Sequence, residues 1–249
     1  MTNAYDGKHF VVTGGGTGVG ARIAQDLNTA GAKVTIMGRS EAPLRAQGLS
    51  YQICDVTDAG AVGTAFDVAR AQYGPVLGVI ANAGAAESVP FAKMAPGLLA
   101  QMLAVNLIGV SNCWQAALPD MQDQGWGRMI AVASTAGLKG YAYVSAYCAA
   151  KHGVVGLTRA LSLELARTGI TVNAICPGFI ETPMLERSVE NIISKTGMSN
   201  EEARKSLVSA NPQKRFIQTD EVAGAALYLA SNAARGVNGA CLTLSGGEV

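Results

Sequence analysis

The sequence has few charged side chains. Asp, Glu, Lys and Arg make up 15% of its 249 residues, and the formal net charge is +1. No run of Lys and Arg stands out, so the sequence predicts no positively charged patch that would bind a nucleic acid or an anionic membrane surface. We therefore expect neither a nucleic-acid partner nor a membrane partner.

Long apolar runs and paired cysteines are also missing. No stretch of about 18 apolar residues predicts a membrane span, and the opening MTNAYDGKHFVV lacks the apolar core of a signal peptide. The five cysteines are scattered without a C-x-x-C pair, which is typical of reduced thiols and offers no metal-ligand spacing. These features predict a cytoplasmic protein with no metal site.

What is present is an alternation of short apolar, β-branched runs with longer helical stretches. Strands are expected at 9–13, 33–37, 51–54, 77–82, 128–134, 171–176 and 240–244, and helices near 18–30, 59–73, 97–124, 144–168 and 220–231. The runs are apolar throughout, as in strands buried on both faces. The pattern predicts an α/β fold over residues 1–249: a single doubly wound Rossmann-type domain, with a seven-stranded parallel sheet and helices on both faces.

One segment, 181–216, interrupts this alternation. It is charged, and its apolar residues fall at helical spacing, with Ser199 and Glu202 placed as a capping box. A helical hairpin over the carboxyl edge of the sheet is expected. It is either surface decoration or a lid over substrate, and its position favours a lid.

A glycine-rich turn, TGGGTGVG, follows the first expected strand and opens the first helix. A bound diphosphate needs a tight turn, close backbone approach and a helix N-terminus, and glycine permits the first two. A glycine turn alone is weak evidence, but GAKVTIMGR completes a βαβ unit after it. The pattern favours a dinucleotide site over a simple tight turn.

Four motifs in order carry a resemblance to a known family. They are T-G-x-x-x-G-x-G at Thr13–Gly20, Asn-Ala-Gly at 82–84, Ser134 with Tyr147-x-x-x-Lys151, and Pro177-Gly178 followed by Thr182. Together they resemble the short-chain dehydrogenase/reductase family over essentially the whole chain. The stretch from 151 to 184 is most similar to bacterial 3-hydroxybutyrate dehydrogenases and aromatic-polyketide ketoreductases.

The resemblance implies the residues of a nicotinamide-cofactor site. They are Gly14, Gly16, Thr17, Gly18, Val19, Gly20, Gly38, Arg39, Asp55, Val56, Asn82, Ala83, Gly84, Tyr147, Lys151, Pro177, Gly178 and Thr182. It also implies a homotetramer. Two of these residues have an alternative role, because Asp55 would equally stabilise a turn and Thr182 would equally cap a helix.

The candidate catalytic residues are Asn106, Ser134, Tyr147 and Lys151. Tyr147 and Lys151 are four positions apart and share a helix face. Tyr147 would exchange a proton with the substrate, and the charge of Lys151 is expected to lower its pKa from about 10. Ser134 would hold the substrate oxygen. The resemblance assigns Asn106 to a water in a proton relay.

Cofactor choice depends on the end of the second expected strand. An enzyme for NAD normally places an acid there, but this chain has Gly38, followed by Arg39, which would bind the 2′-phosphate of NADP. Thr17 replaces the basic residue that many NADP-preferring relatives carry. We expect NADP (NADPH), with NAD as the alternative.

The predicted function is hydride transfer between a nicotinamide cofactor and a ketone or secondary alcohol. The expected pocket wall is apolar, with Phe91, Tyr141, Tyr143, Phe179 and Met184, and with Lys93 and Lys139 as anion contacts. It suits a 3-oxoacyl thioester or an apolar or aromatic ketone. Alternatives are an NAD-dependent dehydrogenase for a 3-hydroxy acid, a 3-hydroxyacyl-CoA or a secondary alcohol, and a nucleotide-sensing protein without catalysis.

Overall fold

The computed structural model describes residues 5–249, so residues 1–4 of the predicted domain lie outside the described residues. Seven parallel strands form one sheet in the order β3-β2-β1-β4-β5-β6-β7. The strands are β1 (His9–Thr13), β2 (Lys33–Gly38), β3 (Ser50–Ile53), β4 (Val76–Ala81), β5 (Gly127–Val132), β6 (Ile170–Pro177) and β7 (Cys241–Leu244). The predicted fold class is confirmed, and each expected strand is present to within two residues.

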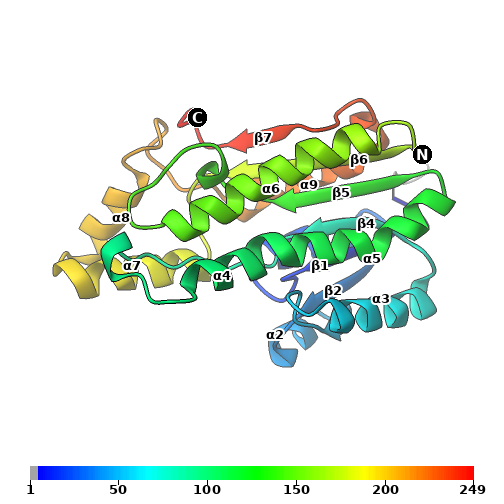
Figure 1. Ribbon diagram of the computed structural model, residues 1–249, viewed down its shortest axis with the longest axis horizontal. Helices are drawn as coiled ribbons and strands as arrows, with labels where there is room; N and C mark the ends of the chain where they lie inside the picture. The colour runs from blue at the N-terminus through cyan, green and yellow to red at the C-terminus, as the bar shows by residue number, and fades with distance from the viewer. Residues whose placement is uncertain (1–4) are drawn as a thin grey trace.

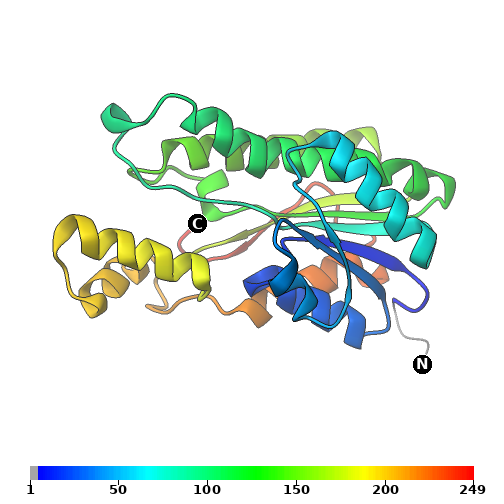
Figure 2. The same ribbon diagram turned by 90° about the horizontal axis from the view of Figure 1, so that it is seen from below.

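Helices cover both faces of this sheet (Figures 1 and 2). One face carries α3 (Ala59–Tyr73), α4 (Leu98–Leu103), α5 (Gly109–Asp123) and α6 (Ser145–Glu164). The other carries α1 (Gly18–Thr29), α2 (Glu41–Arg45) and α9 (Thr219–Ala230). Successive residues of β1 alternate between two separate cores, with Val11 in one and Phe10 and Val12 in the other. Burial on both faces explains why the inner strands β1, β4, β5 and β6 are largely apolar, whereas the edge strands β3 and β7 are only partly buried.

The strand order places the site. Strands β1 and β4 are neighbours, and the chain winds outward from them in both directions. In an open parallel sheet, ligands bind outside the carboxyl ends of the strands at this switch point. The residues that follow β1, β4, β5 and β6 therefore meet at one edge of the sheet, and all four predicted motifs begin there.

The helix expected over 97–124 is interrupted. Between α4 and α5 the chain forms a π-helical turn, η2 (Ala104–Ile108), with the buried Asn106 in it. The apolar periodicity continues across this turn, so no pattern in the sequence indicates it. π-turns inside helices are frequent at functional sites.

The segment 181–216 forms the predicted hairpin, with helices α7 (Pro183–Thr196) and α8 (Asn200–Val208). The capping box of Ser199 and Glu202 is present. The hairpin extends past the carboxyl edge of the sheet (Figure 2). At its base, Ile180 and Ile217 form a parallel bridge, closed by hydrogen bonds from Ile217 N to Phe179 O and from Glu181 N to Ile217 O.

Candidate active site

The glycine turn has no room for a side chain at Gly14 or Gly20. Gly14 and Gly18 adopt φ of +64° and +55°, in the left-handed region that favours glycine. A Cβ atom on Gly14 would lie 2.8 Å from Nδ2 of Asn82, and one on Gly20 would lie 2.3 Å from the carbonyl oxygen of Gly14. Helix α1 starts at Gly18, and its N-cap residue Thr17 makes no side-chain capping bond. The turn therefore brings bare backbone and a helix N-terminus to one place, which fits a diphosphate.

The turn is tied to the end of β4 by side-chain hydrogen bonds. Oγ1 of Thr13 accepts the main-chain N–H groups of Asn82 and Ala83, each at 3.0 Å. Nδ2 of Asn82 donates to the carbonyl oxygen of Thr13 at 3.0 Å. These bonds fix the two strand ends whose motifs were predicted to form one cofactor site.

Most of the predicted cofactor residues line a single pocket. They are Gly14, Thr17, Gly18, Val19, Asn82, Ala83, Gly84, Tyr147, Lys151, Pro177, Gly178 and Thr182. Thr182 occupies the N-cap position of α7 but makes no side-chain cap bond, and its hydroxyl donates to Ile180 O at 3.3 Å. Thr182 thus caps α7 by its position and main-chain carbonyl but not by its side chain, and its predicted cofactor contact stays a prediction.

The predicted adenosine-side residues lie beyond this pocket. A Cβ atom on Gly38 would meet Leu44 at an ordinary 3.5 Å, and the side chain of the following Arg39 is exposed. Asp55 accepts hydrogen bonds from the N–H and hydroxyl of Thr57, and these bonds lower the pKa of Asp55. Asp55 thus performs the turn role, and its predicted adenine contact remains a prediction.

Three further glycine-motif and strand-end residues have packing roles. Gly16 and Gly20 lie outside the pocket, where Gly16 faces Pro43 and its carbonyl accepts a bond from Gln47. Val56 is buried against Gly109, where a Cβ atom would come within 2.6 Å of it. These contacts position the turn and the third strand end rather than reaching into the pocket.

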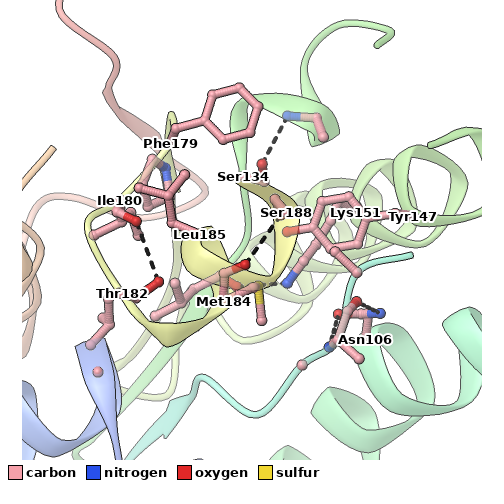
Figure 3. Close-up of a pocket in the computed structure, with 18 of the residues that line it drawn as sticks. Asn106, Ser134, Tyr147, Lys151, Phe179, Ile180, Thr182, Met184, Leu185 and Ser188 are labelled. Atoms are coloured by element: carbon pink, nitrogen blue, oxygen red, sulfur yellow. Dashed lines mark hydrogen bonds between the residues drawn. The ribbon is translucent and has the colours of Figure 1, made fainter. Parts of the chain in front are cut away.

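The candidate catalytic side chains meet in the pocket (Figure 3). Tyr147 and Lys151 lie on α6, with Nζ of Lys151 5.6 Å from the centre of the Tyr147 ring. Ser134 follows β5, and its Oγ accepts the N–H of Ala136 at 3.0 Å. That bond uses a lone pair and leaves the hydroxyl proton of Ser134 to be donated elsewhere.

Burial reverses the expected electrostatics of this pair. It raises the pKa of Tyr147 from 10.0 to about 12, and a hydrogen bond with Ser134 opposes the shift. It also lowers the pKa of Lys151 from 10.5 to about 8. Nζ of Lys151 donates to Val132 O at 2.9 Å instead of contacting the phenol. Among the protein groups alone, the predicted lowering of the Tyr147 pKa by lysine is therefore wrong.

Asn106 is fully buried, and its side chain is engaged on both sides. Oδ1 accepts Ala85 N at 3.2 Å, while Nδ2 donates to Ala85 O at 2.9 Å and to Met102 O at 3.0 Å. Both N–H donors are thus used within the protein. Asn106 fixes the loop after β4 onto the π-turn, and its side chain has no donor left for the predicted water.

The wall facing these groups comes from the loop before α6 and from the start of α7. Tyr141, Phe179 and Met184 line the pocket as predicted, and Val144 and Leu185 join them. By contrast, Phe91 and Tyr143 are exposed by 74% and 64% and lie outside it. Exposure of these rings follows from their positions in loops, which the sequence pattern does not orient.

Charged residues at the pocket differ from those predicted. Lys139 forms an ion pair with Glu248 at 2.8 Å, so it is not available as an anion contact. Arg187 of α7 lines the pocket and was missed, because an exposed Arg on a helix carries no signal in one sequence.

Among residues 5–249, no group of three or more His, Cys, Asp or Glu side chains is arranged to hold a metal ion. No helix in that same range is long and apolar enough to cross a membrane.

Comparison with known proteins finds a family model over most of the chain and relatives over nearly all of it. A family model described as short chain dehydrogenase matches residues 8–192. The chain is 36% identical to a D-beta-hydroxybutyrate dehydrogenase of Cupriavidus necator, with 98% of each chain covered. It is 38% identical to the granaticin polyketide synthase putative ketoacyl reductase 1 of Streptomyces violaceoruber, over 95% of this chain and 91% of that one.

A solved structure agrees with these matches. A variant of actinorhodin polyketide ketoreductase with NADPH has a TM-score of 0.92 and 36% identity, with 97% of each chain covered. The family match includes every motif that forms the pocket, from Thr13 to Thr182. The chain therefore belongs to the short-chain dehydrogenase family and is an oxidoreductase that uses a nicotinamide cofactor.

Proposed function

We propose that this oxidoreductase reduces an apolar or aromatic ketone, or a 3-oxoacyl thioester, with NADPH. The observation that carries the proposal is the meeting of Ser134, Tyr147 and Lys151 in one pocket with an apolar wall. Phe179 and Met184 belong to that wall. Apolar groups beside a carbonyl would be buried there, whereas the hydroxyls of a sugar would find few partners.

When bound, the nicotinamide cofactor supplies the hydride that adds to the carbonyl carbon. The hydroxyl of Ser134 donates a hydrogen bond to the carbonyl oxygen. Tyr147 gives its phenolic proton to that oxygen as the alcohol forms. A pKa of about 12 keeps Tyr147 protonated at neutral pH, which is the form that reduction needs.

The residues at the end of β2 support NADP over NAD. Gly38 presents no carboxylate that would repel a 2′-phosphate, and the exposed Arg39 follows it directly. A guanidinium binds phosphate with two charge-assisted hydrogen bonds. The solved relative that contains NADPH supports the same choice.

A second candidate function is the NAD-dependent oxidation of a 3-hydroxy acid, a 3-hydroxyacyl-CoA or a secondary alcohol. The D-beta-hydroxybutyrate dehydrogenase among the relatives favours it. Arg187, which lines the pocket, would then bind the carboxylate of a hydroxy acid. Comparing NADH with NADPH and both reaction directions distinguishes the two functions.

We also propose a single cytoplasmic catalytic domain that assembles as a homotetramer, with 181–216 as its substrate lid. An apolar groove on the outer face of α5 and α6 supports self-association. Leu107, Ile108, Ser111, Gly153, Gly156, Leu157 and Ala160 line this groove. Light scattering coupled to gel filtration tests the assembly.

The proposed function is tested by turnover with a panel of ketones and both reduced cofactors. Wild type should reduce apolar ketones and prefer NADPH. Tyr147→Phe keeps the ring but removes the proton, so turnover should fall by at least about 10²-fold. Tyr143→Phe is the matched control, because its ring is exposed and outside the pocket. Normal turnover by Tyr147→Phe would overturn the assignment.

A further inference from the structure

The penultimate residue of the chain carries a buried carboxylate. The side chain of Glu248 is only 3% exposed. It reaches that position because the chain turns back after β7, where Gly246 and Gly247 adopt φ of +62° and +93°. Figures 1 and 2 place the C-terminus at the carboxyl edge of the sheet, the edge that holds the pocket.

The partners of this carboxylate all lie in the segment between Ser134 and α6. The hydroxyl of Tyr141 donates to Oε1 of Glu248 at 2.6 Å, and Nζ of Lys139 lies 2.8 Å from the same oxygen. Thr135 Oγ1 lies 2.7 Å from the Tyr141 hydroxyl. Since the single phenolic proton goes to the carboxylate, Thr135 must be the donor in this second bond.

The hydroxyl group of Tyr141 takes part in two hydrogen bonds within the protein. Its proton is donated to Glu248, and its oxygen accepts from Thr135. Burial and the carboxylate both raise the pKa of Tyr141, which keeps its proton in place. Tyr141 therefore presents an aromatic ring to the pocket and has no proton to donate to a substrate.

The ring is also fixed against the opposite wall. Tyr141 packs edge-to-face on Phe179, with ring centres 6.3 Å apart and planes at 80°. Both rings line the pocket. On the other side, Oε2 of Glu248 lies 3.4 Å from where a Cβ atom of Gly178 would be. The carboxylate thus lies between the two pocket walls, one before α6 and one after β6.

We propose that Glu248 is a positioning residue that acts through Tyr141. It holds the Tyr141 ring as an apolar wall and thereby sets the preference of the pocket for apolar ketones. The C-terminal tail is then part of the substrate site, although Glu248 itself does not line the pocket. This inference rests on the proposed apolar ketone substrate.

A double-mutant cycle tests the coupling. Glu248→Ala removes the acceptor, and Tyr141→Phe removes the donor while keeping the ring. Each should raise KM for an apolar ketone about tenfold, because a loosened Tyr141 ring loses part of its apolar contact with the ketone, and change kcat by less than about twofold. Both variants break the Tyr141–Glu248 bond, and Glu248→Ala also removes the ion pair with Lys139, so the double variant should resemble Glu248→Ala rather than show the sum of the two single effects. Cofactor affinity, measured by fluorescence titration, should not change.

Two further variants complete the design. Glu248→Gln keeps an oxygen that accepts from Tyr141, so it should restore most of the affinity for the ketone. Glu164→Ala removes an exposed carboxylate at the end of α6, outside the pocket and the hairpin, and serves as the control. Additive effects of Glu248→Ala and Tyr141→Phe on KM would overturn the proposal, as would an unchanged KM in both.

The result can be separated from failure of the proposed function. The same cycle is measured on the midpoint of thermal unfolding, which reports the hydrogen bond whether or not a ketone is turned over. Coupling in both unfolding and KM supports the positioning role. Coupling in unfolding with no change in KM for an accepted ketone reduces Glu248 to a structural contact and overturns the proposal. If wild type reduces no ketone at all, the proposed function fails, and this inference about its substrate fails with it.

Discussion

Nζ of Lys151 donates a 2.9 Å hydrogen bond to the main-chain carbonyl oxygen of Val132. The bond joins α6 to the end of β5, directly before the segment that carries Ser134. It holds a lysine whose side chain is almost completely buried, at 4% exposure. One carbonyl partner does not replace the water that the ammonium loses, so the charge of Lys151 opposes folding.

Replacing Lys151 by Met should therefore preserve the stability of the protein but remove most of its activity. The pKa of Lys151 is about 8, against an ordinary 10.5, so between these pH values the unfolded chain binds more protons and stability rises with pH. Below pH 8 the buried charge costs about 3 kcal/mol. We expect Lys151→Met to match or exceed the wild-type free energy of unfolding at pH 7, while turnover falls at least about 10²-fold. Urea unfolding at pH 7 and pH 10 measures this, and a variant weaker by about 2 kcal/mol at pH 7 would contradict it.

The rate–pH profile should identify the group that titrates near pH 8. The low pKa of Lys151 predicts that reductive kcat/KM changes near pH 8, well below the pKa of about 12 of Tyr147. Because Lys151 and Tyr147 are close, this limb of the rate–pH profile near pH 8 reports the coupled titration of both groups rather than of one residue. Lys151→Arg keeps a charge at all accessible pH values, and its residual activity should lose the limb near pH 8. A limb that stays in place in Lys151→Arg would assign it to another group.

Cofactor preference should change at the end of β2. Arg39→Ala removes up to two charge-assisted hydrogen bonds to a 2′-phosphate and should weaken NADP binding about tenfold or more, with little change for NAD. Gly38→Asp should shift the preference toward NAD by repelling the phosphate. A Cβ atom at Gly38 meets only Leu44 at 3.5 Å, so the fold should accept this variant. Cofactor preference is measured by comparing kcat/KM with NADPH and NADH. A wild-type preference for NAD would contradict the NADP assignment and favour the NAD-dependent dehydrogenase function.

The hairpin should respond to substrate. Arg204 of α8 contacts Glu186 and lies 3.6 Å from Glu181 of the hairpin base, so α7 and α8 should move as one body. We expect amide exchange in 181–216 to slow when cofactor and a ketone are both added, while β5 stays unchanged. Hydrogen exchange followed by mass spectrometry measures this. Equal protection with and without ligand would make the hairpin surface decoration.

The parts predicted well from sequence are those set by local pattern. Short apolar, β-branched runs predicted the inner strands, because a strand buried on both faces needs mostly apolar residues. The edge strands β3 and β7 were predicted from their place in the alternation with helices. The glycine turn was predictable because no side chain fits between Gly14, Gly20 and Asn82. Tyr147 and Lys151 were predictable as a pair because helical spacing alone places them on one face.

The parts that failed depend on contacts between distant segments. The direction of the Tyr147 pKa is set by burial among several elements, which one sequence does not measure. The π-turn places Asn106 in hydrogen bonds with Ala85, 21 positions earlier in the sequence, and no local pattern indicates that pairing. Glu248 meets Tyr141 across 107 positions of sequence, so no spacing rule could have indicated it.

The bridge between Ile180 and Ile217 has a consequence for how substrate range changes in evolution. It makes the hairpin a closed excursion that leaves the sheet and returns to it at neighbouring points. An excursion of this kind can be lengthened, shortened or exchanged between relatives without altering strand register or the residues after β5. For the proposed substrate lid, this means that new specificities can arise by replacing one insert, while the residues proposed for proton transfer are kept.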